Sequence, residues 1–316
     1  MQAIPRLRAD SYAPHALHGA DREWAETNCY VDLWIELLAA LGREPRAGLG
    51  FTVTQDFEGD QFTFFKFPFE DLRALYGAHV LELAVYDDLA AHVERQVAQG
   101  RVVLVEMDAF HLPDTRGVSY GVEHSKTTIG INRIDRVGRS LSYFHNAGYF
   151  DLAGADYDAL FPPMANGLPL FPYCEMVKLE PCDERDLRAR ARALLRAHLA
   201  RRPRANPVAA FAAALPAQTE ALIGRDPAAF HKYAFNTLRQ LGANFELLAS
   251  HLDWLGEASL APARASAHDI AVGAKTLQFQ LARAVSRRKP QGLEATVAPL
   301  ADAWERVMAS LDASLG

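Results

Sequence analysis

The sequence predicts an α+β protein, in which an N-terminal helix packs on a mixed, largely antiparallel sheet and an all-helical domain follows. Three observations predict this fold class. A helical pattern of apolar residues spans 28–41, three strand-like segments lie between 101 and 144, and beyond 183 Ala, Leu and Arg recur at helical spacing. We place the boundary near residue 180, which gives domains of residues 1–180 and 181–316.

The first helix begins at a recognisable cap. Asn28 is a favourable N-cap, apolar side chains recur every three or four residues after it, and Gly42 ends the pattern. This places Cys29 at the N-terminus of the helix.

The predicted sheet elements come next. Phenylalanine-rich strands are expected at 51–53 and 61–67, and helices at 68–76 and 86–99. The apolar run 101–107 is typical of a buried strand, 126–134 alternates in polarity, and 140–144 pairs with it across a turn that contains Gly138.

A connector then leads to the helical domain. It carries Pro162, Pro163, Pro169, Pro172 and Pro181, and the composition changes beyond Asp183. Prolines at 203, 207, 216, 227 and 262 interrupt the helical part, so we expect helices near 184–201, 206–223, 226–256, 264–287 and 292–314.

Composition excludes some classes of function. The 316 residues carry a net charge of −6, which argues against a nucleic-acid partner, and no apolar stretch approaches the roughly 20 residues of a membrane span. We therefore expect no membrane association and a cytoplasmic protein. The three cysteines form no metal-ligand spacing, and HExxH and P-loop motifs are absent, so we expect no metal and no cofactor.

Cys29 is the candidate nucleophile. A helix N-terminus favours the thiolate, because free backbone amides and the helix dipole stabilise negative charge. The same amides can stabilise an oxyanion, so the Cys29 amide and the Asn28 side chain are candidates for an oxyanion hole. The alternative is a cysteine that serves as a small core residue.

His124 is the candidate base, because it precedes an alternating strand whose edge can face the N-terminus of a packed helix. An acceptor on the neighbouring strand should orient its ring, and Asn146 is our choice. Asp108 and His145 are competitors for that role, and otherwise we expect them to contact the substrate. The alternative for His124 is a surface histidine in a polar loop.

The order of these residues resembles a known family. Cys29 on the first helix, Asp108 followed by Phe110-His111-Leu112-Pro113, a His-led strand, and Asn146 after its partner strand are similar to the N-terminal family of butirosin biosynthesis protein H. That family is a papain-like group of cysteine acyltransferases. This chain departs from it in having His111 for the second aromatic residue and Asn146-Ala147 for a late Asp-Pro.

The whole chain more closely resembles a bacterial family of unknown function encoded near amino acid:carrier-protein ligases. The segments VLVEMDAFHLPDT, EHSKTTIGIN and YFHNAGYF are typical of it. The resemblance implies an acyl or aminoacyl transferase that takes its group from a carrier-protein phosphopantetheine thioester and passes it to a small-molecule or protein acceptor. The alternatives are a cysteine peptidase or thioesterase, and a papain-like scaffold without catalysis.

An arginine-rich helix face is compatible with a carrier-protein partner. Arg185, Arg188, Arg192 and Arg196 share one face of the first predicted helix of the second domain. Such a face could bind an acidic protein, although a solvated arginine-rich helix is the more ordinary explanation.

Overall fold

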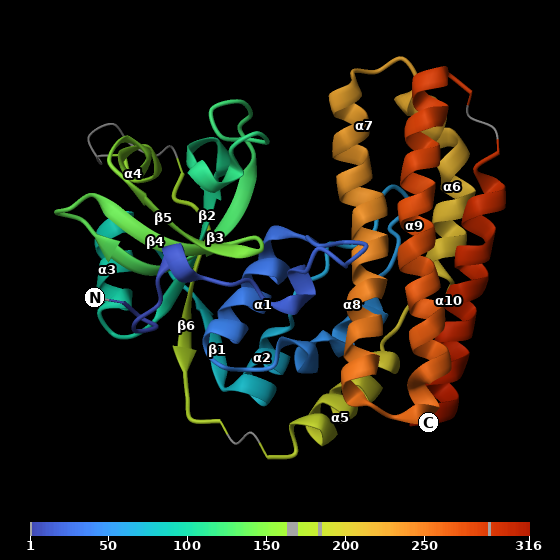
Figure 1. The fold of residues 1–316 in the computed structure, drawn as a ribbon, viewed down its shortest axis with the longest axis horizontal. Helices are drawn as coiled ribbons and strands as arrows, with labels where there is room; N and C mark the ends of the chain where they lie inside the picture. Colours follow the sequence, from blue (N-terminus) through green and yellow to red (C-terminus); the bar gives the residue numbers. More distant parts are fainter. Residues whose placement is uncertain (1, 163–169, 183–184, 290–291) are drawn as a thin grey trace. The chain divides into compact units, whose positions relative to one another are not determined.

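A computed structural model describes residues 2–162, 170–182, 185–289 and 292–316 (Figure 1). Pro163, Pro169 and Asp183, and the expected helix start at 184, lie outside these residues. By its contacts the chain divides into two compact units. The first, here called the sheet unit, comprises the described residues of Met1–Gly19, Asn28–Pro45 and Pro68–Glu184, and the second, the helical unit, those of Ala20–Thr27, Arg46–Phe67 and Arg185–Gly316.

The sheet unit contains six strands in the order β1-β6-β2-β3-β4-β5. Every recorded pairing is antiparallel, so the expectation of a mixed sheet is wrong. Strands β2 to β4 match three of the five predicted strands, whereas β1, β5 and β6 were not predicted. The strands are β1 (Ala78–Glu82), β2 (Val102–Asp108), β3 (Lys126–Asp135), β4 (Ser140–His145), β5 (Gly148–Ala153) and β6 (Cys174–Leu179).

Helices cover both faces of the sheet (Figure 1). Helix α1 (Cys29–Ala40) packs on β3 and β4, and a Cβ atom on Gly130 would touch the side chain of Leu33 at 3.4 Å. Because side chains alternate along a strand, Ile129 and Ile131 point to the opposite face. There they join a buried core with α3 (Leu89–Val97). Two shorter helices, α2 (Phe69–Tyr76) and α4 (Ala155–Leu160), complete the unit.

Helix α1 begins where the sequence predicts. The Asn28 side chain accepts hydrogen bonds from the backbone amides of Tyr30 and Val31, at 3.2 and 3.0 Å. These bonds satisfy two of the amides that every helix leaves free at its N-terminus. The cap therefore fixes Cys29 as the first residue of α1.

The expectation of strands at 51–53 and 61–67 is wrong. Residues Pro45–Thr54 form a 3-10 helix, and only an isolated bridge joins Phe57 to Phe62. These phenylalanines belong to the helical unit, where their rings pack on one another and on α6, and this burial replaces strand pairing. The rings form two groups: Phe51 contacts Phe65 and Phe67, and Phe57, Phe62 and Phe211 of α6 contact one another.

The helical unit confirms the expected all-helical character of the C-terminal region, with two local differences. Pro216 lies inside α6 and does not end it. The expected helix 226–256 is divided by a π-helical segment, Phe235–Arg239, which lies between α7 and α8. The helices are α5 (Leu187–Leu199), α6 (Pro207–Leu222), α7 (Pro227–Ala234), α8 (Gln240–Leu255), α9 (Ala261–Arg287) and α10 (Glu294–Leu315).

Close helix packing in this unit depends on glycine. A Cβ atom on Gly242 of α8 would overlap the indole of Trp24, and one on Gly273 of α9 would overlap Leu300 of α10. The Trp24 indole also donates a hydrogen bond to the carbonyl of Ala271, at 3.0 Å. Within the described part of the chain, no helix has the length and apolar character needed to cross a membrane.

Candidate active site

The candidate site lies where residues 109–125 connect β2 to β3. This connector contains two 3-10 turns, Ala109–His111 and Pro113–Thr115. Its two ends are neighbours, because Asp108 at the end of β2 pairs with Lys126 at the start of β3. A single side chain can therefore contact residues from both ends.

Asp108 is that side chain. Its Oδ1 accepts hydrogen bonds from the backbone amides of Phe110 and Ser125, at 3.0 and 3.2 Å, and its Oδ2 lies 2.5 Å from Nδ1 of His124. Partial burial acts to raise the pKa of this carboxyl group, but the bonds from His124 and the two amides outweigh it and lower the pKa. Asp108 is therefore ionised at neutral pH and can only accept hydrogen bonds.

This bond selects the tautomer of the neutral His124 ring. Because the Asp108 carboxylate cannot donate, Nδ1 of His124 carries the proton, and Nε2 of the neutral ring is left with its lone pair. The structure records no partner for Nε2 among the described residues. The Phe110 ring stacks on the imidazole, with centroids 4.3 Å apart and planes inclined by 10°, while the His124 side chain is 71% exposed. His124 therefore has the tautomer and the accessibility of a general base.

Cys29 lies on the same face of the sheet as this pair. Asp108 and Lys126 alternate with Gly130 onto the face that α1 covers. In the fully described stretch from Thr27 to Leu38, Cys29 is the one residue that is not buried. However, the structure shows no hydrogen bond between the Cys29 thiol and His124, both of which lie in described segments.

The orientation of α1 explains this separation. The Tyr30 hydroxyl donates a hydrogen bond to Glu175 of β6, at 2.8 Å, and Leu33 lies over Gly130 of β3. Further along, Glu36 accepts a hydrogen bond from Tyr12, whose ring contacts Tyr149 of β5. The helix thus crosses the strands from β6 toward β5, instead of running along β3 toward His124.

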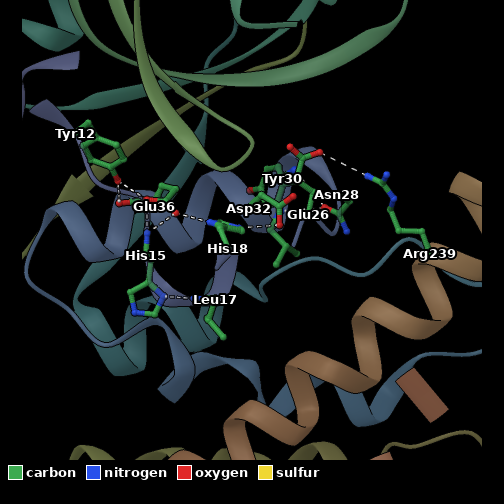
Figure 2. Close-up of polar contacts among 11 residues, drawn as sticks. Tyr12, His15, Leu17, His18, Glu26, Asn28, Tyr30, Asp32, Glu36 and Arg239 are labelled. Atoms are coloured by element: carbon green, nitrogen blue, oxygen red, sulfur yellow. Dashed lines mark hydrogen bonds and ion pairs between the residues drawn. The ribbon is translucent and has the colours of Figure 1, made fainter. Parts of the chain in front are cut away.

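A buried polar cluster attaches the N-terminal segment to α1 (Figure 2). His18 lies between two carboxylates of α1: Nδ1 bonds to Glu36 and Nε2 lies 3.3 Å from Asp32. Burial of His18 acts to lower its pKa, but its bonds to Asp32 and Glu36 outweigh this effect and raise the pKa to about 9. The imidazolium therefore stabilises a helix that would otherwise bury two negative charges.

The other sequence candidates lie elsewhere. His145 is 1% exposed, with Nε2 2.7 Å from the Thr127 hydroxyl and Nδ1 2.5 Å from Asp114. Thr127 alternates onto the face opposite α1. Asn146 is the first residue of the two-residue turn between β4 and β5. Its φ is positive, at 45°, a conformation that asparagine tolerates. Thus Asp108, and not Asn146, bonds to His124; catalytic roles for these residues stay predictions.

The arginine face is partly occupied within the helical unit. Arg188 lies over the ring of Trp254, 5.3 Å from its centroid, and Arg192 bonds to Glu257 at 3.1 Å. The carrier-protein surface remains a prediction. Across the described ranges, no three His, Cys, Asp or Glu side chains are placed to hold a metal ion together.

Sequence reasoning missed three contributors to the site: Phe110 as the ring that covers His124, Asp114 as the partner of His145, and His18 as the buried cation on α1. A signal existed for Asp114, because it lies in the connector only six residues after Asp108, the last residue of β2. However, only the folded sheet shows that Asp114 contacts β4.

The fold and the site define an α+β protein with a helix-terminal cysteine and a separate histidine–aspartate pair on one face of an antiparallel sheet. The family model of the DUF1839 N-terminal domain matches the sequence at residues 13–179, and that of the DUF1839 C-terminal domain matches it at residues 184–313. The chain therefore belongs to the DUF1839 family. No curated protein matches it. The gene neighbourhood and the likeness to butirosin biosynthesis protein H stay predictions.

Proposed function

We propose that this protein is a thiol-dependent acyl or aminoacyl transferase that accepts its group from a carrier-protein thioester. The observation that carries the proposal is the position of Cys29 as the first, partly exposed residue of α1, between buried neighbours. A thiol at this place has the local field of a helix N-terminus and is partly exposed. The resemblance of the sequence to a family of cysteine acyltransferases supports transfer over hydrolysis.

The proposed step is an exchange of thioesters. His124 Nε2 takes the proton of the Cys29 thiol, and the thiolate attacks the carbonyl carbon of the donor thioester. A new carbon–sulfur bond forms to Cys29, the bond to the phosphopantetheine sulfur breaks, and His124 returns the proton to that sulfur. Because one thioester is converted into another, the free energy changes little in this step. The acyl-enzyme can therefore still react with an acceptor amine or hydroxyl.

The step requires the His124 ring to come within hydrogen-bond reach of the Cys29 thiol, nearer than it lies in this structure. Because α1 crosses the strands and does not run toward His124, the proposed role includes a movement of the connector that carries His124. It also makes the proposal specific: a bound donor should change the environment of His124.

Intact-mass measurement tests the proposal. The protein is incubated with an aminoacyl carrier protein, and we expect a mass increase equal to the aminoacyl group. Cys29→Ala should abolish the increase, whereas Cys182→Ala, which removes the other partly exposed cysteine, should leave it unchanged. Equal spectra for wild type and Cys29→Ala would contradict the proposal, and free amino acid as the sole product would identify a hydrolase.

A second candidate is a carrier-binding scaffold without catalysis. It is favoured by the absence, among the described residues, of a hydrogen bond between Cys29 and His124. A scaffold would bind the carrier protein equally well after Cys29→Ala and would show no acylation in either form. Binding measured by calorimetry, alongside the mass spectra, separates the two candidates.

A further inference from the structure

The geometry of the His124–Asp108 pair needs support from outside the pair. Their side chains are 71% and 36% exposed. Ion pairs at such exposed positions contribute little to stability, because water competes for both partners and both side chains lose freedom. Since Phe110 and His124 both belong to the connector, the order of the pair depends on how firmly the connector is held.

The centre of the connector is held by a buried carboxylate. The side chain of Asp114 is 4% exposed and points toward β4. Its Oδ1 accepts a hydrogen bond from the Tyr143 hydroxyl, and its Oδ2 lies 2.5 Å from Nδ1 of His145. Both partners are buried side chains of β4, the strand next to β3.

This network reaches back to the strand that follows His124. Nε2 of His145 lies 2.7 Å from the hydroxyl of Thr127, the second residue of β3. Hydrogen bonds to charged groups in a buried setting are much stronger than those at the surface. The connector is therefore held most strongly at Asp114, where it bonds to β4. The order of the exposed His124–Asp108 pair depends on that contact.

We propose that Asp114 is a positioning residue for the His124–Asp108 pair, acting by fixing the connector to β4 through Tyr143 and His145. The proposal rests on the proposed function and deepens it, because it names a residue that holds the connector on which the base lies. The orientation itself can be measured without substrate, carrier protein or Cys29.

The experiment combines hydrogen exchange with nitrogen NMR of the histidine rings at neutral pH. In wild type, we expect the His124 proton on Nδ1 and slow exchange at the amides of Phe110 and Ser125, which bond to Asp108. In Asp114→Asn, these amides should exchange at least roughly tenfold faster, and His124 should move toward the tautomer mixture of a free imidazole. The amides of paired β3 and β4 residues should keep their rates.

A matched control distinguishes Asp114 from any other attachment of the connector. Asp156 accepts a hydrogen bond from Tyr120 of the connector, at 3.0 Å, in a more exposed place. Asp156→Asn should leave the His124 tautomer and the Phe110 and Ser125 amides near their wild-type values. An equal effect of both substitutions would overturn the proposal, as would acceleration spread evenly over the whole sheet.

A second variant covers the case in which Asp114→Asn does not fold. Tyr143→Phe removes one of the two bonds to Asp114 and leaves its carboxyl group and its bond to His145. It should accelerate the same two amides by a smaller factor, and unchanged rates would overturn the proposal. Cys29→Ala protein gives the same exchange pattern if the inference is right, so failure of the transferase proposal is seen separately in the mass spectra.

Discussion

Nδ1 of His124 lies 2.5 Å from Oδ2 of Asp108, and the two residues stand at opposite ends of the β2–β3 connector. The contact gives a base whose tautomer is set by its carboxylate partner and whose second nitrogen is available. It also means that the base depends on a loop. Chemistry at His124 should therefore be sensitive both to its partner and to the order of the connector.

Asp108→Asn should change the protonation of His124. The amide can donate to Nδ1, so the ring proton should move to Nε2, where it blocks action as a base. We expect nitrogen NMR to show this tautomer and acylation of Cys29 to fall by about 10² to 10⁴-fold. Glu106→Gln, which breaks the neighbouring exposed contact with Lys126, should leave both measurements unchanged. A His124 proton that stays on Nδ1 in Asp108→Asn would contradict the conclusion that Asp108 sets the tautomer.

The three cysteines should differ in reactivity. Burial, with a further contribution from Glu175, raises the pKa of Cys174 to about 12, so this thiol should resist alkylation at pH 8. Cys29 and Cys182 are partly exposed, but the Cys182 sulfur is engaged with the carbonyl of Leu75, at 3.1 Å. We expect iodoacetamide to modify Cys29 first, as read by peptide mass spectrometry. Modification of Cys174 before unfolding would show that this description of its site is wrong.

The His18 cluster should make the sheet unit less stable at alkaline pH. The pKa of His18 is raised from 6.5 to about 9 in the folded protein, so the folded state holds a proton that the unfolded state releases. Its contribution is fully present below pH 6.5 and is lost as the pH rises through 9. We expect the melting temperature to fall between pH 7 and 9.5, and His18→Gln to flatten that dependence. An equal slope in both proteins would rule the cluster out as the cause.

Gly242→Ala should destabilise the helical unit. The added methyl group overlaps the buried Trp24 indole, and such overpacking costs about 1–3 kcal/mol. Urea unfolding followed by tryptophan fluorescence would measure the loss. In a Trp24→Phe background the smaller ring leaves room, so the cost of Gly242→Ala should decrease. Equal costs in the two backgrounds would place the clash elsewhere.

Local signals explain what the sequence predicted correctly. The start of α1 at Cys29 follows from Asn28, because a cap is a contact between residues two or three positions apart. Strands β2 and β3 carry long apolar or alternating patterns, and β4 was predicted because a turn containing Gly138 joins it to β3, whereas β1, β5 and β6 carried no comparable signal. The long C-terminal helices were visible from spacing, although Pro216 did not interrupt α6 as expected.

Which side chains contact one another depends on how the strands pair in the folded protein. The sequence by itself established a cysteine at a helix start, a histidine before a strand and a set of possible acceptors, because these features depend on neighbours along the chain. The register of the sheet places Asp108 beside His124, and it places His145 beside Asp114 on the opposite face. A shift of one residue in register reverses every face, and no local pattern determines register before the strands pair.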